Sequence, residues 1–152
     1  MTISTRPVSP DDAPIVGKLV SALFNELKGV ALSDAKELDL GVVERVLAFN
    51  PRTCGFLLLE DGVAIGVLML SEGCALYARG LYGVITELYI TPDKRSGGRA
   101  KMLIECAEQL AKERHWSMLE VGAPSQPLWQ RSFEFYINNG FHEVGPRLRK
   151  RL

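Results

Sequence analysis

Apolar residues three or four positions apart predict four amphipathic helices along the chain. Ser9 and the acidic residues after it are suited to cap the first helix, because their side-chain oxygens accept hydrogen bonds from the amides of a first turn. Gly41 interrupts the second helix, and Gly140 follows the last one, where a left-handed residue commonly closes a helix. The predicted helices are the stretch up to Leu27, Ala35 to Phe49, the segment after Arg99, and Leu128 to Asn138.

Runs rich in β-branched and aromatic residues predict six strands. Asp61-Gly62 joins two of them, and this dipeptide is typical of a tight hairpin between antiparallel strands. Along the third long run, strict alternation places Ile85, Glu87 and Tyr89 on one face. The predicted strands are Ile3 to Arg6, Gly55 to Glu60, Val63 to Ser71, Leu81 to Thr91, Ser117 to Val121 and Phe141 to Val144.

The order of these elements is β-α-α-β-β-β-α-β-α-β, which predicts an α/β fold of the α+β kind. We expect a mixed, mostly antiparallel sheet flanked by helices. With 152 residues and no linker-like stretch, the chain is expected to form one domain over residues 1–152.

Composition excludes several classes of function. Lys and Arg number 18 and so do Asp and Glu, so no net charge draws the protein to nucleic acid. The longest apolar run, Val63 to Leu70, is far shorter than the roughly 20 residues that span a bilayer. Cys54, Cys74 and Cys106 form no CxxC pair, so we expect neither a disulfide scaffold nor a metal site. A reducing, cytoplasmic setting fits this pattern best.

A basic, glycine-rich turn joins the third long strand to the following helix and is the strongest candidate for chemistry. Small residues let a ligand approach the backbone, and the free amides of a first helical turn favour negative charge. The turn matches neither GxxxxGK[ST] nor GxGxxG, and a solvated basic turn is the plain alternative. We predict a phosphate or pyrophosphate site formed by Arg95, Ser96, Gly97, Gly98, Arg99, Ala100 and Lys101.

The run from Thr86 to Leu103 resembles the acetyl-coenzyme A signature of the GNAT N-acetyltransferase superfamily. Its R/QxxGxG/A turn corresponds here to Arg95, Gly98 and Ala100. A second stretch, Phe135 to Phe141, is similar to the FYxxxGF element that closes the same fold. The resemblance implies acetyl-CoA as co-substrate, with the pyrophosphate on the turn. It also implies that the pantetheine arm pairs with the backbone of Leu88, Tyr89 and Ile90.

Two residues are catalytic candidates, Tyr136 from the resemblance and Glu87 from its position in the strand. Tyr136 matches the tyrosine that protonates the coenzyme sulfur in many relatives, although it also fits a core aromatic of an amphipathic helix. Glu87 precedes the pantetheine segment and is a candidate base for the amine, with a solvent-facing glutamate as the alternative and water as the alternative base. Trp129 stands where relatives often carry an Asn that contacts the pantetheine arm.

The resulting function is transfer of an acetyl group from acetyl-CoA to a primary amine, with a small molecule as the leading acceptor. A protein or peptide amine is the near alternative, and Trp129 keeps open a non-catalytic, acyl-CoA-binding regulatory module. The resemblance places the acceptor pocket around Leu27 to Val43, a mildly acidic region that suits a cationic amine. It also implies, by analogy with relatives, a homodimer.

Overall fold

A five-stranded sheet forms the centre of the molecule, and its strands lie in the order in which they occur along the chain. The computed structural model describes residues 1–124 and 129–152. Neighbouring strands are antiparallel except β4 and β5, which are parallel. The elements are β1 (Ile3–Pro7), α1 (Ala13–Leu27), α2 (Leu40–Leu47), β2 (Thr53–Glu60), β3 (Val63–Ala75), β4 (Gly80–Ile90), α3 (Arg99–Glu113), β5 (Leu119–Val121) and α4 (Gln130–Asn138), with single 3-10 turns at Pro10–Asp12, Leu32–Asp34 and Pro92–Lys94.

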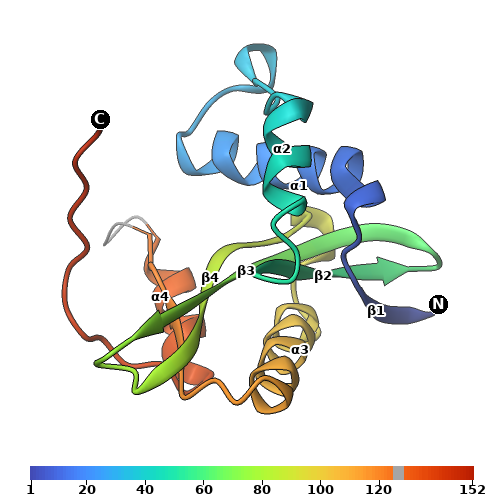
Figure 1. Cartoon of the computed structure of the whole chain (residues 1–152). Helices are drawn as coiled ribbons and strands as arrows, with labels where there is room; N and C mark the ends of the chain where they lie inside the picture. Colours follow the sequence, from blue (N-terminus) through green and yellow to red (C-terminus); the bar gives the residue numbers. More distant parts are fainter. Residues whose placement is uncertain (125–128) are drawn as a thin grey trace.

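Helices cover both faces of the sheet, with α1 and α2 on one side and α3 and α4 on the other (Figure 1). Consecutive residues such as Leu57 and Leu58 are therefore both fully buried, each in a different core. A sheet covered on both faces needs apolar side chains on both, which explains why β2 and β3 read as continuous apolar runs. The predicted α+β fold and its mixed sheet are confirmed.

The turns that the sequence predicts are also present. Asp61 and Gly62 both have positive φ angles, 50° and 82°, as a two-residue turn between antiparallel strands requires. At the start of the first helix, the Asp12 carboxylate accepts hydrogen bonds at 2.8 Å from the Ser9 amide and from both terminal nitrogens of Arg6. These contacts, led by those of Arg6, lower the pKa of the buried Asp12 to about 2.

The second helix is shorter than predicted, because α2 begins at Leu40 and not at Ala35. The Asp39 side chain caps it by accepting a hydrogen bond from the Gly41 amide at 3.0 Å. The residues before the cap lie against α1 instead. Asn25 Nδ2 donates to the Lys36 carbonyl at 2.8 Å, and the Leu38 amide donates to Ser21 Oγ at 2.8 Å.

The predicted last strand, Phe141 to Val144, does not form, and residues 141–152 contain no helix or strand. The Phe141 amide donates to the Tyr136 carbonyl at 3.0 Å, so it closes the end of α4 and is not free for a sheet. Gly145, at a φ of 130°, and Pro146 then bend and interrupt the segment, which runs past α4 toward the other face (Figure 1). Leu128, the predicted first residue of the last helix, lies outside the described residues.

A β-bulge in β4 interrupts the alternation of side chains that the sequence predicts for this strand. Met69 pairs with Glu87 and Leu70 pairs with Ile85, so Thr86 is an extra residue without a partner across the ladder. Ile85 therefore belongs to the core under α3, whereas Tyr89 belongs to the core under α1. The sequence places Ile85, Glu87 and Tyr89 on one face, and for Ile85 this is wrong.

Candidate active site

The two parallel strands part where the bulge lies. β5 pairs with β4 only over Gly83–Ile85. Within the described part of the chain, no strand continues beside β4 from Glu87 to Ile90 on that side. The backbone predicted to pair with the pantetheine arm, at Leu88, Tyr89 and Ile90, therefore lies at an open sheet edge that an extended ligand can extend.

The turn before α3 presents its amides outward. Ser96, Gly97 and Gly98 have φ angles of 101°, 68° and 76°, so three successive residues are left-handed or close to it. Within residues 1–124 and 129–152, the amides of residues 96–101 have no protein acceptor. They add to the positive end of the 15-residue helix α3, which favours a bound anion.

The turn also has open space at Gly98, where an anion could approach the amides. A methyl group added at Gly98 would find no atom within 4 Å, so the turn is open to an approaching ligand. Free amides, left-handed backbone and open space together fit a diphosphate group. Among the described residues this is where the structure best fits the implied coenzyme, with residues 96–101 as the donors.

The basic side chains of the turn are less free than the sequence indicates. Arg95 forms a bidentate ion pair with Glu26 of α1, in which its two terminal nitrogens lie 2.9 and 2.7 Å from the two carboxylate oxygens. Arg99 approaches Glu60 at 3.4 Å, and Lys94 pairs with the same carboxylate at 2.5 Å. Glu26 and Glu60 cannot be predicted as partners from the sequence, since each lies at the end of a distant element and no local pattern marks it. Of the three cations predicted for the site, only Lys101 is exposed without a protein partner in the described part of the chain.

Arg99 retains one unused donor. Its Nε atom is buried and has no hydrogen-bond partner among the described residues, although its terminal nitrogens contact Ser96 O and Glu60. An unpaired buried donor at the start of α3 is costly unless a ligand or water satisfies it. It is a second observation in favour of an anion at this turn.

Glu87 lies on the α1 side of the sheet, opposite Met69 of β3. Its side chain is half-buried and accepts a hydrogen bond from the Thr86 hydroxyl at 2.7 Å. Burial raises the pKa of Glu87 above its usual value, more strongly than the Thr86 hydrogen bond lowers it. A carboxylate with a raised pKa is a better proton acceptor near neutral pH.

Tyr136 lies on α4, on the opposite side of the sheet, and packs against the α3 core. Its ring meets Phe135 and Phe141 edge-on, with centroids 5.4 and 5.5 Å away. Burial raises the pKa of Tyr136 to about 12, and no described residue hydrogen-bonds its hydroxyl. The ring therefore packs among core side chains, and the raised pKa keeps its hydroxyl protonated at neutral pH.

The structure places the two catalytic candidates on opposite faces of the sheet, Glu87 on the α1 side and Tyr136 on the α3 side. Trp129, where relatives often have Asn, immediately precedes α4, and its carbonyl accepts the amides of Ser132 and Phe133 at 3.0 and 3.2 Å. Its backbone therefore starts the helix that carries Tyr136.

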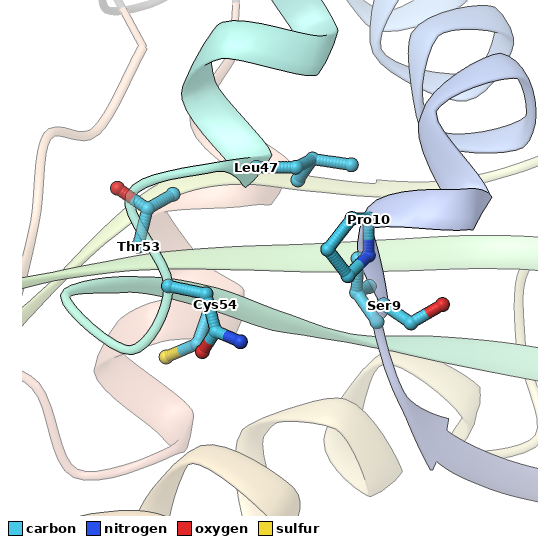
Figure 2. A pocket seen from close by; sticks show the side chains of 7 residues that line it. Ser9, Pro10, Leu47, Thr53 and Cys54 are labelled. Atoms are coloured by element: carbon cyan, nitrogen blue, oxygen red, sulfur yellow. The ribbon is translucent and has the colours of Figure 1, made fainter.

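Two of the hollows in the described part of the chain lie on the α1 and α2 side. Figure 2 shows the smaller one, of about 10 Å³, between Ser9 and Pro10 at the start of α1, Leu47 of α2, and Thr53 and Cys54 of β2; no predicted site residue lines it. The larger, of about 220 Å³, lies in the region predicted for the acceptor. Its charged lining is balanced and not acidic, since it consists of Lys28, Asp34, Lys36 and Glu37.

Other kinds of site are not found in the described residues. No group of three or more His, Cys, Asp or Glu side chains in residues 1–124 and 129–152 is placed to hold a metal ion. In the same residues no helix has the length and apolar character needed to cross a bilayer. The three cysteines are free thiols.

A family model described as the acetyltransferase (GNAT) family matches residues 20–135. No curated protein sequence matches the chain. An aminoglycoside acetyltransferase from an uncultured soil metagenomic sample is similar in structure, with a TM-score of 0.81 and 20% identity over 100% of this chain and 99% of that one. A second enzyme of that description, in complex with sisomicin, has a TM-score of 0.80 and 16% identity over 99% and 96% of the two chains.

A protein-modifying enzyme is about as similar. The ribosomal-protein-alanine N-acetyltransferase of Brucella melitensis biovar Abortus 2308 has a TM-score of 0.77 and 19% identity, over 99% of this chain and 100% of that one. Identities this low establish a shared fold without establishing a shared acceptor.

Proposed function

Since the chain belongs to the acetyltransferase (GNAT) family, an acetyl-CoA-dependent family, we propose that it acetylates a primary amine of a small molecule. The observation that carries the proposal is the set of amides at residues 96–101, which have no acceptor among the described residues and stand at the start of α3, after the edge of β4 that no described strand covers. A diphosphate satisfies these donors, and an extended amide-containing arm satisfies the edge.

Acetyl-CoA supplies the activated acetyl group when bound. The residues proposed to hold it are the turn from Arg95 to Lys101 and the backbone of Leu88, Tyr89 and Ile90. We expect the turn to act mainly through main-chain amides, because the side chains of Arg95 and Arg99 already have carboxylate partners.

Two side chains complete the proposed chemistry. Glu87 takes the proton that the amine nitrogen must lose, and its raised pKa suits that task. Tyr136 keeps its hydroxyl proton at neutral pH and presents it to the leaving sulfur. The two act from opposite faces of the sheet, so acceptor and donor would approach the reacting centre from different sides.

Two observations favour a small acceptor. Two similar structures are described as aminoglycoside acetyltransferases, one of them in complex with sisomicin. The 220 Å³ hollow beside α1 is small and lined by charges of both signs, which suits a compact polar amine better than a long peptide. Protein N-acetylation is the second candidate, because the similar Brucella structure is described as acting on ribosomal protein.

The test measures both binding and turnover. Calorimetry with coenzyme A establishes the site, and release of free thiol from acetyl-CoA is then followed with polyamines, aminoglycosides, amino acids and short peptides. We expect binding and turnover with at least one small amine. Turnover with peptides alone would favour the second candidate, and coenzyme binding without turnover would favour the regulatory module that Trp129 keeps open. No binding at millimolar coenzyme would refute the proposal.

We also propose a cytoplasmic location, supported by the three free thiols. Fractionation of the source cells tests it, and recovery with a secreted fraction would contradict it.

A further inference from the structure

The Arg95 side chain is held on three sides. Its Nε donates to the Ile90 carbonyl at 2.8 Å, and its two terminal nitrogens donate to the two oxygens of Glu26 at 2.9 and 2.7 Å. The guanidinium also lies over the Tyr89 ring, 5.3 Å from its centroid. Two parallel hydrogen bonds to one carboxylate fix the orientation of the planar guanidinium, which a single ion-pair contact would not do.

These contacts join α1 to the segment after β4, since Glu26 and Arg95 are 69 residues apart in sequence. Glu26 lies in the last turn of α1, Ile90 ends β4, and Arg95 directly precedes the left-handed turn. The turn needs such support, because Ser96 has a side chain and still adopts a φ of 101°, a conformation that costs free energy. The residues after it therefore keep their outward amides only while something holds the loop.

We propose that Glu26 is a positioning residue for the coenzyme site: through Arg95 its carboxylate holds the turn Ser96–Gly98 in the shape that binds a diphosphate. The inference rests on the proposed function and extends it, since it gives Arg95 a bracing role in place of a direct phosphate contact. The inference also links the 220 Å³ hollow to the coenzyme site, because α1 both lines the hollow and carries Glu26.

The opposite arrangement makes a different prediction. If Arg95 were a phosphate ligand that Glu26 occupies in the free protein, removing the Glu26 charge would release the guanidinium and tighten coenzyme binding. If Glu26 braces the turn, the same change weakens binding. The sign of the change in affinity therefore separates the two.

The experiment compares Glu26→Gln with Glu44→Gln, a matched control on α2 whose exposed side chain has no ion pair or hydrogen bond in the described part of the chain. Calorimetry with coenzyme A is expected to give a Kd raised about threefold to tenfold in Glu26→Gln and unchanged in the control. Arg95→Gln and the double variant are expected to match each other, because Glu26 acts only through Arg95. An unchanged or lower Kd in Glu26→Gln, or additive effects in the double variant, overturns the inference.

A second readout needs no ligand. The Lys94 amide donates to the Thr91 carbonyl and the Met102 amide to the Gly98 carbonyl, so both report on the order of the turn. We expect both to exchange with solvent about threefold to tenfold faster in Glu26→Gln than in Glu44→Gln. Equal exchange rates in the two variants refute the bracing role. If the wild-type protein binds no coenzyme, the proposed function fails, while the exchange rates still decide whether Glu26 holds the turn.

Discussion

The Tyr136→Phe variant gives the sharpest test of the proposed chemistry, because it removes one oxygen and leaves the ring in place. The Tyr136 hydroxyl has no hydrogen-bond partner among the described residues, whereas the ring packs between Phe135 and Phe141. The variant should therefore fold normally and melt within about 2 °C of the wild type. Any loss of rate then belongs to the hydroxyl.

The size of that loss follows from the raised pKa. A thiol ordinarily has a pKa of about 8.5. Burial raises the pKa of Tyr136 to about 12, so complete transfer of its proton to a thiolate is uphill by about 5 kcal/mol. The hydroxyl then acts mainly as a hydrogen-bond donor to the developing negative charge. Such a bond contributes about 1.5 to 3 kcal/mol, which corresponds to about tenfold to about 150-fold in kcat.

The assay is thiol release at saturating acetyl-CoA between pH 6 and pH 10, with the amine that gives turnover. Tyr77→Phe is the matched control, because it also deletes a phenol hydroxyl. Tyr77 lies in the turn between β3 and β4, and its hydroxyl donates to Glu120 of β5 at 2.7 Å. We expect kcat to fall only in Tyr136→Phe and the coenzyme Kd to change in neither variant. Equal kcat for wild type and Tyr136→Phe would refute the role. A wild-type rate that falls near pH 10 and is flat in the variant would refute the pKa argument, since the raised pKa keeps the hydroxyl protonated below about pH 11.

Three further changes test other parts of the structure. Gly98→Ala places a side chain at a φ of 76°, in open space, so we expect urea unfolding to show a stability loss of about 1 kcal/mol. We also expect the coenzyme Kd to rise at least about tenfold, and an unchanged Kd would show that the turn is not the binding surface. Because burial raises the pKa of Glu87, wild-type kcat/KM should fall as pH drops through that pKa, and Glu87→Gln should be slower and lack this limb; a retained limb would place the base elsewhere. The Asp12 pKa of about 2, against an ordinary 3.8, stabilises the fold by about 2 kcal/mol above pH 4, and this contribution is lost as pH falls through 2. Asp12→Asn should therefore be less stable than wild type at pH 7 and nearly equal at pH 2, and a pH-independent difference would contradict the linkage.

Local signals in the sequence were sufficient for most of the fold. The Asp61-Gly62 turn, the apolar spacing of α1 and α3, and Gly140 after α4 each depend on a few neighbouring residues, and each is confirmed. The errors arise where other groups take the hydrogen bonds that a predicted helix or strand needs. Residues before Asp39 bond to α1 and not to their own helix, and the Phe141 amide closes α4 and does not enter the sheet.

The site divides in the same way. The glycines of residues 96–101 and the helix that follows them mark this turn in the sequence, and the structure has left-handed backbone there. Its electrostatics were not predictable, since the partners of Arg95 and Arg99 come from 69 and 39 residues away. The roles assigned to Tyr136 and Glu87 stay predictions until their variants are measured.

The extra residue at Thr86 has a consequence for the unpaired edge of β4. A chain shortened by Thr86 alone would retain Glu87 and Tyr89 over α1, and Leu88 and Ile90 over α3, because the alternation after the bulge would be unaltered. Its β4 strand, however, would lose the local bend of the bulge, and β5 could then pair with β4 beyond Ile85. Such a protein would keep its core residues in place and yet cover the edge of β4 with its own backbone.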